Sequence, residues 1–309
     1  METRTRAQQA GSQVSARAWR NFSKLSILFL VMSSQIFGIG QDPGREDKNR
    51  GRSEPTEIPF QLYNDNLIIV KGTVGTIKGV NLILDTGTTP TSISKSLASR
   101  LKLHGNTEPL ETLNGVIQTE SFILPHVQVG AISADGVRVV TQNLEFMEQS
   151  LGIPVGGILG LDVLRSHNFT IDYRKKKISL GTIPEAKNLV HFETQSPLLT
   201  VKASVEGQEL RLIVDSGTSG LVIFGNRFKE NSGALRAAQG TFITTVAGTP
   251  QAKFFRTSVT LGQDTGERTV TIAEASPGAG DSFDGLLGFT AMGFRKVSFD
   301  FENGTLGWE

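Results

Sequence analysis

Short apolar runs separated by turn-forming residues make up most of the chain after residue 57. The runs are rich in β-branched residues and are bounded by Gly, Asn, Asp and Pro, which is the pattern of β-strands. Helical patterns are short, at residues 93–101 and 228–238. The pattern therefore predicts an all-β protein with few helices. Clear strand-like runs are residues 67–70, 80–84, 137–141, 210–214 and 269–273.

Three motifs occur twice in the same order, which points to an internal duplication. Each motif returns 128 or 130 residues after its first copy. We therefore predict two similar domains, at residues 58–184 and 185–309. The pairs are residues 82–88 with 212–218, residues 157–160 with 285–288, and residues 171–173 with 299–301.

The first forty residues differ from the rest of the chain. Residues 25–32 are almost entirely apolar, basic residues precede them, and Gly38 and Gly40 supply small side chains after them. This order is typical of an export signal. We predict a signal peptide or an N-terminal membrane anchor at 1–40, with attachment through 25–39, and a flexible polar spacer at 41–57. A buried core helix is the alternative interpretation. The protein would be periplasmic or secreted.

Composition excludes several kinds of chemistry. The 309-residue chain has no cysteine, which excludes disulfides, thiolate catalysis and cysteine-based metal centres. Its four histidines do not show a metal-ligand spacing, so we expect no metal and no cofactor. The formal net charge is only +1, which argues against a nucleic-acid partner. The basic run at 174–177 is interpreted as a solvated hairpin tip, and 302–304 as its counterpart with an Asn-Gly turn of type I′.

Two aspartates follow the duplicated apolar strands. Asp85 is followed by Thr-Gly-Thr and Asp215 by Ser-Gly-Thr. A glycine two residues after each aspartate permits a tight turn that brings backbone N–H groups close to the carboxylate. If the two halves pack together, the carboxyls meet and share one proton, because like charges that close cannot both ionise. Such a pair can activate a water molecule while polarising a carbonyl group.

Both motifs resemble the signature of pepsin- and retropepsin-like aspartic proteases, here as a bacterial-type chain with two tandem retropepsin-like domains. In that family two apolar residues and a glycine follow each signature on a strand that braces the aspartate loop. This chain has such residues 75 positions after Asp85 and 73 positions after Asp215. The two brace sets are Ile158, Leu159 and Gly160, and Leu286, Leu287 and Gly288.

The resemblance implies a fold and a role for each motif residue. It implies two β-barrel lobes related by pseudo-two-fold symmetry, with the active-site cleft between them, and Asp85 and Asp215 as the catalytic pair. Hairpins carrying Gly115 and Gly248 are the candidate flaps over the cleft. The residues implied to support the pair are Thr86 and Ser216, which would cross-link the loops, Thr88 and Thr218, which would bind the outer carboxyl oxygens, and the turn glycines Gly87 and Gly217.

The predicted function is that of an aspartic endopeptidase acting on extended polypeptide. We expect a monomer, since the linker at 181–196 is long enough for the two halves to pair within one chain. The alternative is a non-catalytic descendant that binds peptide in the same cleft or serves in assembly. The presence of an aspartate in both signatures favours catalysis over binding.

Overall fold

The computed structural model describes ten stretches of the chain. They are residues 27–28, 31–32, 56–112, 115–193, 197–228, 239–242, 244–245, 251–273, 283–290 and 292–309. Apart from the backbone of two short strands, the predicted export segment lies outside the described residues. So do the spacer up to residue 55, Gly248, and most of the helix expected at 228–238.

Strands from the first half form a nine-stranded sheet with the order β2-β8-β9-β10-β7-β11-β6-β5-β4. A further pairing of β9 with β5 curls the sheet back on itself. The strands are β2 (Val31–Met32), β4 (Gln61–Tyr63), β5 (Leu67–Val74), β6 (Ile77–Leu84), β7 (Ser92–Ser94), β8 (Asn106–Thr112), β9 (Gly115–Val129), β10 (Ile132–Gln142) and β11 (Gly157–Leu159).

The second half forms a seven-stranded sheet with the order β15-β16-β22-β17-β21-β20-β18. This order matches β5-β6-β11-β7-β10-β9-β8 strand for strand, and β15 pairs with β20 as β5 pairs with β9. The sequence repeat is thus accompanied by a repeated strand order. The strands are β15 (Thr200–Val205), β16 (Gln208–Val214), β17 (Leu221–Phe224), β18 (Gln239–Phe242), β20 (Gln251–Leu261), β21 (Asp264–Ala273) and β22 (Gly285–Leu287).

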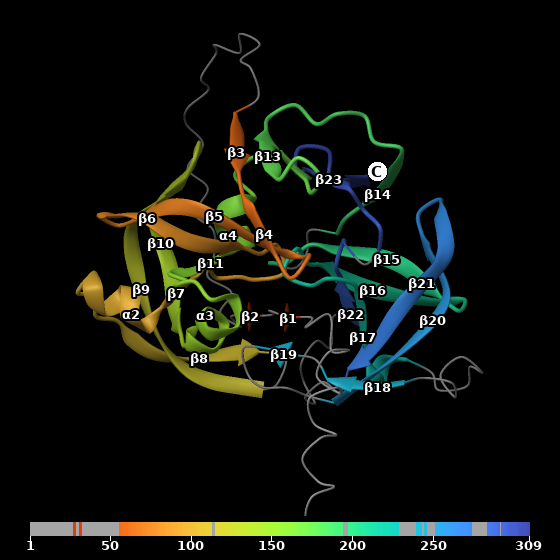
Figure 1. The fold of residues 1–309 in the computed structure, drawn as a ribbon, viewed down its shortest axis with the longest axis horizontal. Helices are drawn as coiled ribbons and strands as arrows, with labels where there is room; N and C mark the ends of the chain where they lie inside the picture. The colour runs from red at the N-terminus through yellow and green to blue at the C-terminus, as the bar shows by residue number, and fades with distance from the viewer. Residues whose placement is uncertain are drawn as a thin grey trace, which may run out of the picture.

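A six-stranded sheet joins the two halves, with the order β14-β24-β23-β12-β13-β3. At its centre β12 pairs antiparallel with β23, and the rings of Phe169 and Phe299 stack with centroids 4.6 Å apart. Figure 1 shows this sheet above the other two. Its strands are β3 (Glu57–Pro59), β12 (Phe169–Asp172), β13 (Lys177–Leu180), β14 (Asn188–His191), β23 (Lys296–Asp300) and β24 (Thr305–Trp308). Glu57, predicted to end the spacer, is therefore the first residue of a strand.

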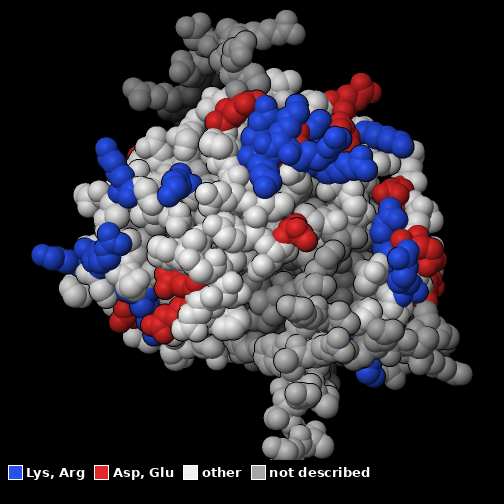
Figure 2. Space-filling model, in the orientation of Figure 1, with Lys and Arg blue, Asp and Glu red and all other residues white. Residues whose placement is uncertain are grey.

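Both predicted hairpins of this sheet are present, but one turn differs from expectation. β12 and β13 are joined by residues 173–176, and β23 and β24 by residues 301–304. In each loop only the last residue, Lys176 or Gly304, has a positive φ. A type I′ turn at Asn303-Gly304 needs positive φ at both residues, so that prediction is wrong. Figure 2 shows Lys and Arg side chains gathered where Figure 1 places β13 and β23, which agrees with a solvated basic tip.

Few helices accompany the sheets. They are α2 (Lys95–Arg100), α3 (Glu145–Leu151), α4 (Leu161–Leu164) and the 3₁₀ turn η1 (Gly225–Arg227). The expected helix at 93–101 is confirmed as α2, whose N-cap Ser94 accepts a hydrogen bond from the Leu97 N–H. α3 covers a small apolar cluster with Met147 and Leu151. Among the residues that the structure describes, no helix has the length and hydropathy needed to cross a bilayer.

Candidate functional site

Each aspartate follows directly from a buried strand and is fixed by the strand beside it. β6 ends at Leu84, and the N–H of Asp85 donates to the carbonyl of Leu159 at 3.0 Å. β16 ends at Val214, and the N–H of Asp215 donates to the carbonyl of Leu287 at 3.0 Å. β11 and β22, which carry most of the predicted brace residues, run parallel to β6 and β16. The backbone of both aspartates is therefore anchored from two sides.

The brace glycines Gly160 and Gly288 lie just beyond these strands, where space is lacking for a larger residue. A Cβ on Gly160 would come within 2.7 Å of the Thr88 carbonyl, and one on Gly288 within 2.1 Å of the Thr218 carbonyl. Gly160 also donates to the Thr91 hydroxyl at 2.9 Å. The glycines thus let the brace approach the turn that follows each aspartate.

Thr86 and Ser216 connect the two aspartate loops through four buried hydrogen bonds. The Thr86 hydroxyl donates to the Val214 carbonyl at 2.9 Å, and the Ser216 hydroxyl donates to the Leu84 carbonyl at 3.1 Å. Each hydroxyl also accepts from the other residue's backbone N–H at 3.0 Å. Both oxygens therefore act as donor and acceptor, and they hold together segments 130 positions apart in the sequence.

Donors from the following turn surround each carboxyl. Asp85 accepts from the Gly87 N–H at 2.8 Å and from the Thr88 hydroxyl at 3.0 Å. Asp215 accepts from the Gly217 N–H at 2.7 Å, the Thr218 N–H at 3.1 Å and the Thr218 hydroxyl at 2.8 Å. Both aspartates are fully buried. Asp215 thus has one more donor than Asp85 from its own loop.

The two carboxyls lie close enough for each to alter the pKa of the other. Gly87 makes this approach possible, because a Cβ there would lie 2.5 Å from the Asp215 Cγ. Burial, followed by the charge of Asp215, raises the pKa of Asp85 well above its ordinary value. Burial also raises the pKa of Asp215, to about 6, while hydrogen bonds from Thr218, Asp85 and Gly217 act in the lowering direction. This geometry favours a proton on Asp85 and a charge on Asp215.

Two polar residues without a motif of their own also reach the loops. Asp162, on α4, accepts from the Thr91 N–H and hydroxyl at 3.0 and 2.7 Å, and burial raises its pKa. Asn66 donates its Nδ2 hydrogen to the Gly217 carbonyl at 2.8 Å. Neither residue was predicted from the sequence. Asn66 lies in a turn with no distinguishing motif. Asp162 differs from Thr290, its counterpart in the second half, and this difference was the only sequence signal for it.

One candidate flap hairpin is described in part. Thr112 pairs with Gly115 in the last described pair of β8 and β9, and residues 113–114 lie outside the described residues. After Gly115, Val116 and Ile117 are 62% and 39% exposed. The other hairpin joins β18 to β20, and its tip, with Gly248, lies outside the described residues. The structure therefore places Gly115 at a hairpin tip.

Two short backbone segments from near the N-terminus pair with the hairpins. β2 lies antiparallel to β8, with Val31 opposite Thr112. β1 (Ile27–Leu28) lies parallel to β19 (Thr244–Thr245), in the segment between β18 and β20. The free edge of each hairpin region thus accepts an extended strand.

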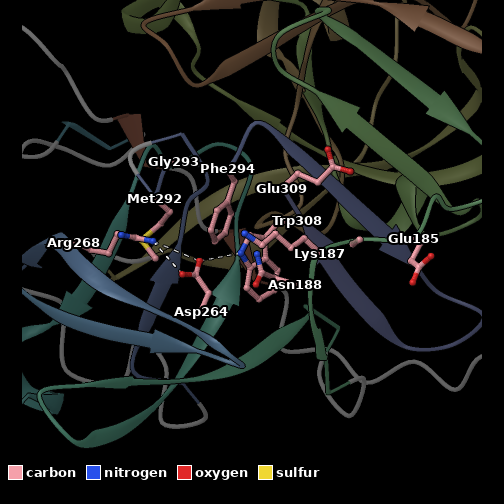
Figure 3. A pocket seen from close by; sticks show the side chains of 11 residues that line it. Glu185, Lys187, Asn188, Asp264, Arg268, Met292, Gly293, Phe294, Trp308 and Glu309 are labelled. Atoms are coloured by element: carbon pink, nitrogen blue, oxygen red, sulfur yellow. Dashed lines mark hydrogen bonds and ion pairs between the residues drawn. The ribbon is translucent and has the colours of Figure 1, made fainter.

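A cavity of about 690 Å³ lies away from the aspartate loops. In Figure 3 the side chains of Arg268 and Trp308 are directed at Asp264: Arg268 forms an ion pair with Asp264 at 3.3 Å, and the Trp308 indole N–H donates to Asp264 at 3.2 Å. No residue of either aspartate loop or brace strand lines it. Within the described part of the chain, no group of three or more His, Asp or Glu side chains is placed to hold a metal ion.

Residues 70–163 match a family model described as aspartyl protease. The matched segment contains the Asp85 loop and the first brace, and it ends before the second half begins. A search of curated proteins found no significant match. The family match supports an aspartyl protease family and a peptidase type of activity.

Proposed function

We propose that the protein is an aspartic endopeptidase that hydrolyses peptide bonds in extended polypeptide with a water molecule held between Asp85 and Asp215. The main support is the pair of buried carboxyls, one from each half of the chain, whose loops are held side by side by the hydrogen bonds of Thr86 and Ser216. A buried carboxyl pair that binds one proton supplies both a base and an acid at the same place. The family match covers only the loop of Asp85, so the role of Asp215 rests on this geometry.

The hydrogen bonds support a separate role for each aspartate. Asp215, with three donors from its own loop, is the ionised member and removes a proton from the water. Asp85 is the protonated member and gives its proton to the substrate carbonyl oxygen as the water oxygen bonds to the carbon. The resulting gem-diol breaks down as Asp215 gives its proton to the nitrogen, one diol hydroxyl gives its proton to Asp85, and the C–N bond breaks. The pair ends with one proton, as it began.

The fold suits the binding of a peptide in an extended conformation. The edges of β8 and β19 already pair with short strands of the same chain, which supports β-strand addition as the binding mode. The exposed apolar side chains beyond Gly115 would cover the substrate from the hairpin. We further propose that the halves act as two lobes about a pseudo-two-fold axis within a monomer, which the repeated strand order supports.

Export of the protein is part of the same proposal. It is supported by the basic, then apolar, then small-residue order of the first forty residues. A peptidase acting outside the cytoplasm, free or anchored through residues 25–39, would meet unfolded polypeptide there.

The test is cleavage of a mixture of unstructured peptides by the purified full chain, from about pH 3 to pH 8. Asp85→Asn and Asp215→Asn proteins provide the controls, since each removes one member of the pair. We expect cleavage by the wild type and none by either variant. Survival of cleavage in one variant would show that the carboxyls do not form one site. Binding of peptide without cleavage at any pH would favour the non-catalytic peptide-binding module.

A further inference from the structure

Asn66 is a buried polar residue whose hydrogen bonding is incomplete. It lies just before β5 and is only 1% exposed. Its Nδ2 donates to the Gly217 carbonyl, two residues from Asp215, across 151 positions of sequence. Its Oδ1 has no hydrogen-bond partner in the described part of the structure. A buried acceptor without a partner destabilises a fold, so this amide oxygen is free to accept a further hydrogen bond near the Asp215 loop.

The described residue of the second half that corresponds to Asn66 is not an amide. Extended two residues beyond the pair Ile68–Leu84, the register of β5 with β6 would set Asn66 against Thr86. Extended three residues beyond the pair Thr200–Ile213, the register of β15 with β16 would set Pro197 against Ser216. Proline has no side-chain hydrogen-bonding group. The Pro197 carbonyl accepts a hydrogen bond from Arg165 at 2.6 Å. Residues at equivalent positions of the two halves thus differ in what they can offer a bound molecule.

A carboxamide has the hydrogen-bonding groups needed to bind a peptide backbone. It offers one carbonyl acceptor and N–H donors, which are the complements of a peptide N–H and C=O. The χ2 torsion of asparagine is broad, so the amide plane can turn from the Gly217 carbonyl towards a neighbouring chain, where new hydrogen bonds to that chain would replace the bond it gives up. Asn66 is therefore able to exchange an internal hydrogen bond for bonds to substrate.

We propose that Asn66 is a substrate-binding residue, whose carboxamide hydrogen-bonds the backbone of polypeptide bound beside Asp215. This inference rests on the proposed function, because it takes polypeptide as the ligand. It makes the two sides of the site unequal, since the described residue that corresponds to Asn66 on the Asp85 side is Pro197. Backbone recognition there is independent of the substrate's side chains.

The experiment measures binding of a fluorescein-labelled decapeptide whose scissile amide is replaced by a methylene-amine group, so that it is not cleaved. Its sequence comes from the cleavage mixture, or from selection for binding to the full chain if nothing is cleaved. Ester analogues of the peptide, each lacking one backbone N–H, are compared on three full-length proteins: wild type, Asn66→Leu and the control Pro197→Ala. Leucine matches the size of asparagine but forms no hydrogen bonds.

We expect Asn66→Leu to raise the Kd roughly tenfold, as for the loss of one or two hydrogen bonds, while Pro197→Ala changes it less than about twofold. At one position of the peptide, replacing the amide with an ester should weaken binding to the wild type. The same replacement should not weaken binding to Asn66→Leu any further, because both changes remove the same hydrogen bond. Equal Kd values for wild type and Asn66→Leu, or additive losses at every ester position, would overturn the inference. A wild type that binds but does not cleave would overturn only the proposed catalysis, because the binding comparison remains valid.

Discussion

The Thr86 and Ser216 hydroxyls form a reciprocal pair: each donates to the carbonyl just before the other residue's aspartate and accepts from the other residue's N–H. The contact sets the distance between the aspartates, since it lies one residue beyond each. It also makes the stability of the molecule depend on contact between its halves.

Replacing Thr86 with valine should lower the free energy of unfolding by about 2–4 kcal/mol. Valine keeps the shape but leaves the Val214 carbonyl and the Ser216 N–H without this partner, and each buried unsatisfied group costs about 1–3 kcal/mol. Urea unfolding measures the change. Thr260→Val is the control: its hydroxyl is bonded to Thr265 in an exposed setting, and its effect should stay within about 0.5 kcal/mol. Equal effects of both variants would contradict the predicted importance of the cross-link.

Replacing Gly87 with alanine should abolish cleavage. The new Cβ would lie 2.5 Å from the Asp215 Cγ, so the carboxyls must separate, and a displacement of about 1 Å can reduce a rate by about 100-fold. Steady-state kinetics on a peptide substrate measure the loss. Gly225→Ala is the matched control, because its Cβ would have ordinary contacts at 3.5 Å or more. Full activity in Gly87→Ala would mean that the close carboxyl contact is not needed.

Activity should rise with pH as Asp215 ionises, with the acid limb of the profile near pH 6, because the pKa of Asp215 is raised to about 6. It should fall again at higher pH when Asp85 loses its proton. The kcat/KM profile of the free enzyme reports both steps as properties of the coupled pair. An acid limb below about pH 4 would show that the charge on Asp215 is better stabilised than its burial indicates.

The same raised pKa values predict a pH dependence of stability. For each aspartate the pKa is higher in the folded state than in the unfolded state. At a pH between the unfolded-state pKa and the folded-state pKa of a given aspartate, the folded state therefore binds more protons. The free energy of unfolding therefore falls as pH rises from about 4 through about 6. Asp215→Asn should lose less stability over this interval than the wild type does. Urea titrations at a series of pH values test this, and parallel curves would contradict it.

Asp162→Ala should loosen the Asp85 loop, since the Thr91 N–H and hydroxyl lose their buried acceptor. We expect a loss of about 1–3 kcal/mol and faster amide hydrogen exchange at residues 88–91 but not at 218–221. Asp162→Asn should restore most of the protection, because one oxygen, Oδ1, accepts both Thr91 donors. Thr290→Ala, at the equivalent place in the second half, is the control. Unchanged exchange at 88–91 in Asp162→Ala would refute the prediction.

The sequence predicts the aspartate loops well because their geometry is local. Each aspartate, its turn glycine and its threonine lie within four residues, and the brace glycines are required by close backbone contact. Asn66 could not be predicted, since its hydrogen bond to Gly217 depends on how distant segments pack. The six-stranded sheet was missed for the same reason: it combines strands from both ends of the described chain. α3 was not predicted because it is short, its N-cap Leu144 provides no side-chain hydrogen bond, and only Met147 and Leu151 are buried.

The pairing of β2 with β8 and of β1 with β19 has a consequence for maturation. If export removes the first forty residues, both short strands leave with them. The backbone groups at these two edges then face solvent or another molecule, and an open edge is a template for further strand pairing. A newly cleaved molecule could thus pair with any extended chain nearby, including a second copy of itself. The local concentration of the cleaved protein would then determine whether the open edges pair with another copy or with a different chain.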